Sequence, residues 1–396
     1  MARELAASLA LSLSVGFVCV PMHAQQTGAV ASTTPGSAIG RKLPSVQVPV
    51  AKPSCISPAA SSATSSELPK IPDLIFSRDD LICVRHKDGS TQELPHGVPW
   101  GVYSASGDQV AYWGGAQKHE LHVFSLVSHT DEVIDTASRA MGPVWSAKGH
   151  VLAYVPGNAN PPGIRIVDVD TGKRIVAPGA FTGIFASPAR AYVGAMSFDG
   201  IERVNLIDGQ RELVVPAKYL QNAAYSPDGT FIGIQASEPS ALLALTPDKW
   251  PKPPAASDQD EEPDCGGGAS YLILWNAATK RLTDVPFPKG FDSIVEFEFS
   301  PDGHAIAVTF GSSTSCDYPG DEARVFVVSL PDLNLTPVSP ASRLCAQPHW
   351  SPDGNVIIYG DFNGPFPLIA VDVHTGKMTT VVNRNVNGPD TFLGWR

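Results

Sequence analysis

The chain has 396 residues, of which 35 are glycine and 36 are proline, and only 17% are charged. This composition lacks the long Ala/Leu/Glu/Lys stretches of helical bundles and coiled coils, and it favours an all-β fold of many short strands. The formal net charge is −11, and the sequence contains no run of Lys or Arg. Binding to nucleic-acid phosphates requires a basic patch, so we expect no nucleic-acid partner.

Residues 1–24 have the pattern of a secretory signal peptide. Arg3 precedes a stretch of apolar or small residues from 5 to 20, and a small residue, Ala24, precedes the expected cut. The stretch is shorter than the ~20 residues of a transmembrane helix, so we expect no membrane span after cleavage. An uncleaved anchor and a lipoprotein signal at Cys19 are the alternatives. The pattern predicts a periplasmic or secreted protein.

Residues 25–71 contain no aromatic residue and are rich in Ser, Thr, Ala and Pro. Such a segment buries too little apolar surface to offset the entropy lost on ordering, so we expect a disordered linker. The simpler interpretation is that the segment is a spacer between the signal peptide and the folded domain. The alternative is that part of the segment binds a partner as an extended strand.

Residues 72–396 contain a repeat in which an aromatic residue is followed by Ser-Pro-Asp-Gly and a short apolar run. Three full copies and three weaker ones begin at Tyr225, Phe299, Trp350, Tyr103, Trp145 and Phe185. The turns of successive copies are 42, 41, 39, 74 and 51 residues apart. A period of about 40 residues with four strand signals per unit indicates a β-propeller, in which each blade is a four-stranded sheet.

The two ends of this region are incomplete repeats that complement each other. Residues 391–395 match the innermost strand, 73–77 match the second strand, and 81–92 match the third and fourth. Joined in one sheet, they close the ring and remove its exposed edge. The sequence therefore predicts a seven-bladed β-propeller closed by pairing of the N- and C-terminal strands, with six blades as the alternative.

Two long insertions, 246–268 and 312–322, interrupt the repeat between the second and third strands of neighbouring blades. Equivalent loops of a propeller emerge on one face, where a rigid scaffold commonly carries its function. The residues that we expect to contact a ligand there, by position only, are Trp250, Asp258, Asp260, Glu261, Tyr318 and, on an innermost strand, His349. The acidic loop lacks the regular spacing of a Ca²⁺ loop, so we interpret it as solvated.

Five cysteines remain after loss of the signal peptide, and export permits them to form disulfides. Cys265, Cys316 and Cys345 map to the loop-rich face. We favour a Cys316–Cys345 bridge, with Cys265–Cys316 as its rival, because spacing does not determine connectivity. Cys83 lies within a strand, and we expect it to be a small buried apolar residue rather than a bridge partner.

Catalytic motifs are missing from the sequence. It contains no Gly-x-Ser-x-Gly, no glycine-rich phosphate loop before a helix and no His-Glu-x-x-His. His349 lies on an innermost strand near the mouth of the channel, and the equivalent positions hold Val102, Val144, Ala224 and Glu298. Because Glu298 alone offers a second ligand, we expect neither a metal site nor another cofactor.

The Ser-Pro-Asp-Gly turns between an aromatic residue and an apolar strand resemble the repeat of the TolB-type (WD-repeat-like) β-propeller family over residues 72–396. The same repeat occurs in the propellers of prolyl oligopeptidase and dipeptidyl-peptidase relatives. The resemblance implies a fold rather than a role. TolB carries an α/β domain where this chain has residues 25–71, the peptidases use a separate hydrolase domain, and propeller lyases use several inner-strand histidines where this chain has His349.

The combined expectation is an exported, monomeric, non-catalytic propeller that binds a protein or peptide of the cell envelope on its loop-rich face. Two interpretations from other classes stay open. One is a propeller enzyme, of the lyase, lactonase or glycan-hydrolase kind, and the other is a glycan-binding protein, each acting at the mouth of the channel.

Overall fold

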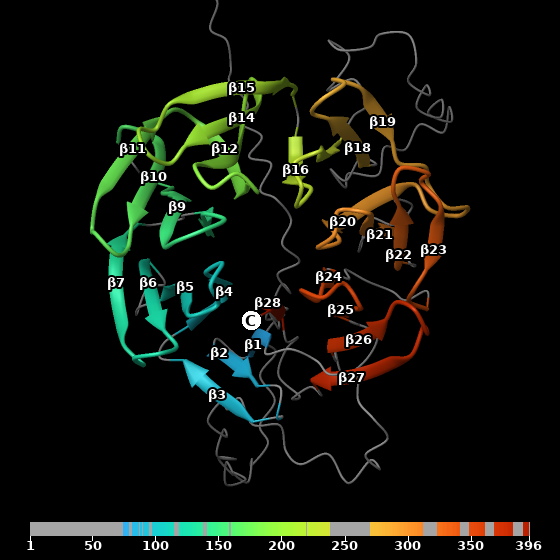
Figure 1. Ribbon diagram of the computed structural model, residues 1–396, viewed down its shortest axis with the longest axis horizontal. Coiled ribbons are helices and arrows are strands. Elements are labelled where there is room, and N and C mark those ends of the chain that lie inside the picture. The colour runs from blue at the N-terminus through green and yellow to red at the C-terminus, as the bar shows by residue number, and fades with distance from the viewer. Residues whose placement is uncertain are drawn as a thin grey trace, which may run out of the picture.

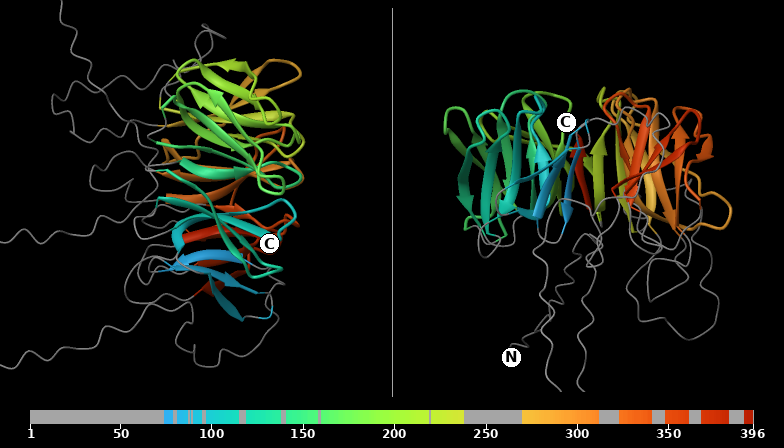
Figure 2. Two further views of the ribbon diagram at one scale, coloured as in Figure 1. Left: turned by 90° about the vertical axis from the view of Figure 1, so that its left-hand side faces the viewer. Right: turned by 90° about the horizontal axis from the view of Figure 1, so that it is seen from below.

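Seven antiparallel four-stranded sheets surround a central axis in the computed structural model (Figure 1). The structure describes residues 74–395 except for 79–80, 87, 89, 95–96, 115–118, 138–140, 158–159, 219, 238–269, 312–322, 341–347, 361–367 and 383–390. These described residues form strands and no helix, and from the side the sheets stand next to one another as a thick disc (Figure 2). The prediction of a seven-bladed β-propeller is confirmed, and the six-bladed alternative is wrong.

The closing blade is built from both ends of the chain. From the inside outwards its strands are β28 (Thr391–Trp395), β1 (Leu74–Arg78), β2 (Leu81–Arg85) and β3 (Thr91–Leu94). Leu74 pairs with Trp395 in the antiparallel register of β1 and β28. The predicted closure by the N- and C-terminal strands is therefore confirmed.

Blades 1 to 3 follow in chain order, each beginning with its innermost strand. Blade 1 consists of β4 (Gly97–Tyr103), β5 (Gln109–Gly114), β6 (Glu120–Ser125) and β7 (Asp131–Thr136). Blade 2 consists of β8 (Met141–Trp145), β9 (Val151–Val155), β10 (Gly163–Asp168) and β11 (Arg174–Pro178). Blade 3 consists of β12 (Phe181–Ala186), β13 (Tyr192–Ser197), β14 (Gly200–Asn205) and β15 (Arg211–Pro216).

Blades 4 to 6 complete the ring in the same order. Blade 4 consists of β16 (Leu220–Tyr225), β17 (Phe231–Ala236), β18 (Tyr271–Asn276) and β19 (Leu282–Asp284). Blade 5 consists of β20 (Ser293–Phe299), β21 (Ala305–Gly311), β22 (Ala323–Ser329) and β23 (Leu335–Pro337). Blade 6 consists of β24 (His349–Trp350), β25 (Val356–Gly360), β26 (Leu368–Asp372) and β27 (Met378–Val382).

The Ser-Pro-Asp-Gly motif forms the turn between the first and second strands. In blade 4, Ser226 donates its hydroxyl to Asp228, 2.6 Å away, and accepts the amide of Phe231 at 2.8 Å. Gly229 has a φ of +74°, a conformation that residues with a Cβ rarely adopt. The same Ser–Asp bond closes the corresponding turns of blades 5 and 6. The motif therefore stabilises its own turn, and its aspartates have a structural role.

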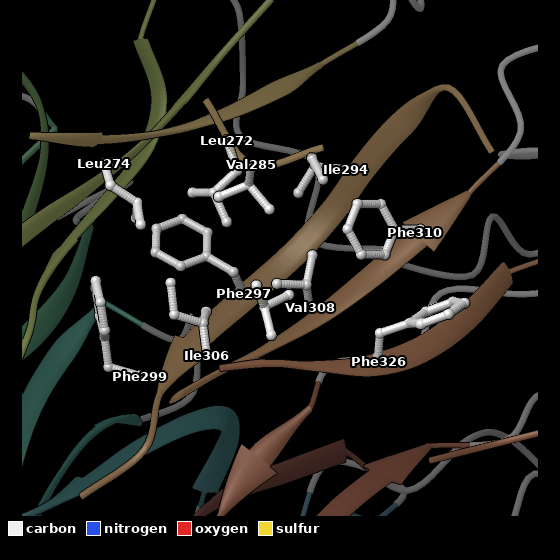
Figure 3. Packing of buried hydrophobic residues seen from close by; sticks show 11 residues of the cluster. Leu272, Leu274, Val285, Ile294, Phe297, Phe299, Ile306, Val308, Phe310 and Phe326 are labelled. Carbon is white, nitrogen blue, oxygen red and sulfur yellow. The ribbon is translucent and has the colours of Figure 1, made fainter. Parts of the chain in front are cut away.

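Aromatic rings fill the space between blades 4 and 5 (Figure 3). Phe297 of β20, Phe310 of β21 and Phe326 of β22 are buried there, together with leucine, isoleucine and valine side chains. The rings of Phe310 and Phe326 meet edge to face with centroids 5.4 Å apart. Burial of this much apolar surface is the main stabilising contribution at this seam.

Polar side chains join blades 1, 2 and 3 near the outer rim. Asp135 of blade 1 accepts hydrogen bonds from Tyr154 and Arg165 of blade 2. Arg174 of blade 2 donates to a backbone carbonyl of β7 at 2.6 Å, and Arg211 of blade 3 donates to one of β11 at 2.7 Å. Each arginine thus fixes an outermost strand to the following blade.

Cys83 corrects one expectation from the sequence. It is fully buried on β2, as expected, but it is a disulfide cysteine, and its partner lies outside the described residues. A cysteine in the middle of an apolar strand looks the same in the sequence whether it is bridged or not. The predicted signal peptide, 1–24, and linker, 25–71, also lie outside the described residues. Within the described part of the chain, no helix is long and apolar enough to cross a membrane.

Candidate functional site

The loop-rich face is the face of the disc at which the second strand of each blade ends and the third begins. Residues 238–269 connect β17 to β18, and residues 312–322 connect β21 to β22, so both connections start and end on this face. The predicted contact and disulfide residues Trp250, Asp258, Asp260, Glu261, Tyr318, Cys265, Cys316 and Cys345 lie outside the described residues. Their roles stay predictions, and His349 is the predicted site residue that the structure describes.

The innermost strands surround the channel along the axis of the ring. In the innermost strands of blades 1 to 6, the residue just before the last aromatic residue is half-buried. These equivalent residues are Val102, Val144, Ile184, Ala224, Glu298 and His349. At these positions blades 1 to 4 hold apolar side chains that pack against the apolar clusters between blades, whereas blades 5 and 6 hold an acid and an imidazole. Among these described positions, the polar side chains lie in blades 5 and 6.

A β-bulge determines which side chains of β20 share a face of the strand. Ile294 pairs with Phe310 and Glu296 pairs with Thr309, so Val295 is an extra residue in this strand. Side chains three apart point to opposite faces of a regular strand, but the bulge allows both Ile294 and Phe297 to be buried. The alternate residues after the bulge, Glu296 and Glu298, then lie on the face of β20 opposite to Phe297 and Phe299.

Blade 4 supports this bulge through polar side chains. The Gln235 amide donates to the Ile294 carbonyl at 2.9 Å, and the hydroxyl of Ser270 donates to the same carbonyl. A bulge frees backbone groups from the strand ladder, and these groups need other partners when they are buried. Gln235 and Ser270 supply those partners, so blade 4 fixes the position of the two glutamates of blade 5.

His349 and Glu298 form a pair across the seam between blades 5 and 6. Nδ1 of His349 lies 2.7 Å from a carboxylate oxygen of Glu298, and the two side chains are 31% and 39% exposed. The neighbouring Trp350 donates its indole N–H to the backbone carbonyl of Glu298 at 3.1 Å. Two consecutive residues of β24 thus hold both the side chain and the backbone of Glu298.

Glu296 lies one step closer to the loop-rich face than Glu298. It accepts a hydrogen bond from the Asn222 amide of β16 at 3.1 Å. Burial raises the pKa of Glu296 above its ordinary value, and the charge of His349 and the bond from Asn222 offset this only in part. The carboxylate form is therefore incompletely compensated by the protein.

We call Asn222, Glu296, Glu298 and His349 the channel cluster. The sequence suggested His349 and, as a possible ligand, Glu298, but it did not point to Asn222 or Glu296. The alternating glutamates of β20 were visible in the sequence, whereas the bulge that gives them their orientation was not. Among the described residues, no group of three His, Cys, Asp or Glu side chains is placed to hold a metal ion.

The channel cluster has two chemical capacities. An incompletely compensated carboxylate beside an amide attracts a cationic or hydrogen-bond-donating ligand group. A carboxyl group with a raised pKa next to a carboxylate–imidazole pair is also a possible general acid–base system.

No protein-family model matches the sequence, and no curated protein matches it. Solved structures share its fold. An oligogalacturonate lyase in complex with manganese is 13% identical with a TM-score of 0.54, over 80% of this chain and 86% of the lyase. The propeller domain of the trilobed protease from Pyrococcus furiosus is 12% identical with a TM-score of 0.53, over 80% of this chain and 94% of that domain.

TolB from Acinetobacter baumannii is 14% identical, over 81% of this chain and 80% of TolB, with a TM-score of 0.47. Identities of this size show a shared fold and leave the activity open. The protease propeller has an open velcro topology, whereas β28 and β1 close the ring here. The chain is thus a seven-bladed propeller of the kind that its TolB-type repeat predicts.

Proposed function

We propose that this protein is an exported, non-catalytic β-propeller that binds a segment of a protein or a peptide in the cell envelope. The ligand lies on the loop-rich face and places a basic group in the channel. The observation that carries this proposal is the channel cluster, in which the innermost strands of three neighbouring blades bring polar side chains together.

The charge of the cluster favours a basic ligand group. The pKa of Glu296 is raised, mainly by burial, so the folded protein bears a free-energy cost when this carboxyl group ionises. An ammonium or guanidinium group of a ligand would remove that cost by pairing with the carboxylate. The net charge of −11 attracts basic segments over longer distances as well.

Features of the sequence and of the topology support the proposed location and oligomeric state. The signal-like residues 1–24 support export, and the linker-like residues 25–71 support a spacer that presents the propeller at a distance. Pairing of β28 with β1 completes the closing blade from both ends of the chain, and this closed ring supports a monomer.

A pull-down from envelope extract tests the proposal. Residues 25–396 serve as bait, beside a variant in which 250–267 is replaced by a Gly/Ser link, and quantitative mass spectrometry identifies the bound proteins. We expect a partner that is enriched by the intact chain and lost with the loop. A partner retained by the loop variant contradicts the assigned face, and enrichment of no protein by either bait contradicts the scaffold function.

A second candidate function rests on the acid–base character of the channel cluster. Glu296 with its raised pKa and the Glu298–His349 pair suit a propeller enzyme of the lyase, lactonase or glycan-hydrolase kind, or a glycan-binding protein. The purified protein would be incubated with a panel of polysaccharides and lactones, and product formation and glycan retention would both be measured. Turnover lost in Glu296→Gln but kept in Glu132→Gln, at an exposed position of β7, would support the enzyme.

A further inference from the structure

His150 lies on the face opposite to the loop-rich face, at the seam between blades 1 and 2. It follows Gly149 in the turn between β8 and β9, and its side chain is 19% exposed. Nδ1 lies 2.8 Å from a carboxylate oxygen of Asp170, in the turn between β10 and β11 of the same blade. Nε2 lies 3.2 Å from a carboxylate oxygen of Asp108, which belongs to blade 1.

Both ring nitrogens therefore face carboxylate oxygens. A neutral imidazole carries one N–H, so its second nitrogen would direct a lone pair at a carboxylate. The imidazolium carries two N–H groups and donates to both aspartates. We propose that His150 is a pH-sensitive latch between blades 1 and 2, in which the imidazolium joins Asp170 to Asp108 and loss of its proton releases one of them.

The electrostatic environment agrees with this geometry. Burial alone would lower the pKa of His150, but the hydrogen bonds to Asp170 and Asp108 outweigh it and raise the pKa. The hydrogen bond from Ser106, supported by those from Ser104 and His150, lowers the pKa of Asp108 despite partial burial. Asp108 therefore stays ionised while His150 titrates.

The other charged side chains on the two turns that carry His150 and Asp170 are not placed as partners of the His150 ring. Lys148, in the same turn as His150, is exposed. Lys173, at the end of the hairpin that holds Asp170, reaches towards the carbonyl of Ile207 in blade 3 at 3.5 Å. The uncharged ring of Trp145 lies edge to face with the imidazole, with centroids 6.2 Å apart.

Ser106 gives the site a superficial likeness to a serine hydrolase. Its hydroxyl oxygen lies 3.2 Å from Nε2 of His150, while Asp170 faces Nδ1. A general base needs an unprotonated Nε2 to take the serine proton. Here Asp108 also faces Nε2 and accepts the Ser106 hydroxyl, so the arrangement favours the protonated ring. We therefore assign a latch rather than a nucleophile.

The sign of the pH effect follows from the raised pKa of His150. Its stabilising contribution is fully present below the ordinary histidine pKa of about 6.5, and it is lost as the pH rises through the higher value of the folded protein. His122 also lies between two carboxylates, Asp131 and Glu120, but all three belong to blade 1. Because the wild type and the His150 variant both retain His122, the contribution of His122 to the pH dependence cancels in their difference.

Thermal unfolding of the full chain and of His150→Gln, between about pH 5 and pH 9, tests the latch. We expect the variant to unfold a few degrees lower at acidic pH and the difference to shrink as the pH rises. His304→Gln is the matched control, because His304 follows Gly303 at the same turn position of blade 5 and is exposed. The control should show no such pH-dependent difference. Parallel pH profiles of the wild type and His150→Gln would overturn the proposal.

Proton NMR of the His150 ring provides a second measurement that does not depend on a variant that folds. In the wild type we expect its pKa above the ordinary value, and in Asp108→Asn and Asp170→Asn a shift towards that value. An ordinary or lower pKa in the wild type would overturn the latch. Labelling of Ser106 by a serine-directed fluorophosphonate, lost in His150→Gln, would also overturn it, because it requires an unprotonated base.

Discussion

The seams between blades 1, 2 and 3 contain buried apolar clusters, as the seam between blades 4 and 5 does, but they add polar and charged contacts near the outer rim. Between blades 1, 2 and 3, arginine and tyrosine side chains reach across the seams to Asp135 and to backbone carbonyls. Between blades 4 and 5, phenylalanine rings fill the seam. Apolar burial depends little on pH and is not screened by salt, whereas ionic contacts depend on the charge of both partners and are screened. The channel cluster lies at the seams of blades 4 to 6, where the aromatic core adds to the polar contacts of Gln235 and Ser270.

The largest expected loss of stability comes from a substitution in the aromatic cluster between blades 4 and 5. Phe310→Ala removes a ring that is fully buried beside Phe326, and we expect a loss of about 3–5 kcal/mol in the free energy of unfolding. Urea denaturation measures it. Phe198→Ala is the control, because Phe198 is 73% exposed, and its effect should stay within about 0.5 kcal/mol. Equal effects of the two substitutions would contradict the assigned role of the aromatic seam.

A smaller effect is expected at the polar contacts between blades 1 and 2. Asp135→Asn weakens the contact that Tyr154 and Arg165 make across the first seam, at a cost of about 1–3 kcal/mol near neutral pH. Burial would raise the pKa of Asp135, but its two donors outweigh this and lower it. The difference between wild type and variant should therefore be present above the ordinary Asp pKa of about 3.9 and disappear as the pH falls through the lower folded value. A difference that persists in strong acid would contradict this ion-pair account.

The smallest expected effect is a gain in stability. Burial raises the pKa of Asp284, on β19 of blade 4, to about 6, and one of its carboxylate oxygens is buried without a hydrogen-bond partner. Its favourable contribution is present below the unfolded pKa and is lost as the pH rises through about 6. At pH 7.5, Asp284→Asn should raise the free energy of unfolding by about 1 kcal/mol, after a discount for partial exposure. Equal stability of variant and wild type from acid to alkaline pH would show that the carboxyl group is solvated.

The fold was largely predictable from the sequence because its signals are local. The turn of Ser226, Asp228 and Gly229 is stabilised by its own side chains, so it can be identified without knowledge of the neighbouring blades. The strand segments at the two ends also identified the closing blade. Even the apolar surroundings of Cys83 were foreseen, although its disulfide was not.

The candidate site was less predictable because it depends on contacts between blades. His349 could be placed on an innermost strand, but its 2.7 Å approach to Glu298 depends on how blades 5 and 6 pack. The position of Glu296 depends on an extra residue, Val295, which leaves no mark in the hydrophobic pattern. Asn222 acquires a role only because β16 lies beside β20 in the ring. Sequence periodicity records burial within one strand and carries little information about such neighbours.

The pairing of β28 with β1 also determines when the protein can become a ring. Because the innermost strand of the closing blade is Thr391–Trp395, this blade lacks that strand until residues 391–395 have been synthesised. The most distant contact along the sequence is thus required for the last step of assembly, and folding rates fall as contacts become less local. The ring therefore stays open until β28 pairs with β1, and formation of the closing blade is the step that completes the propeller.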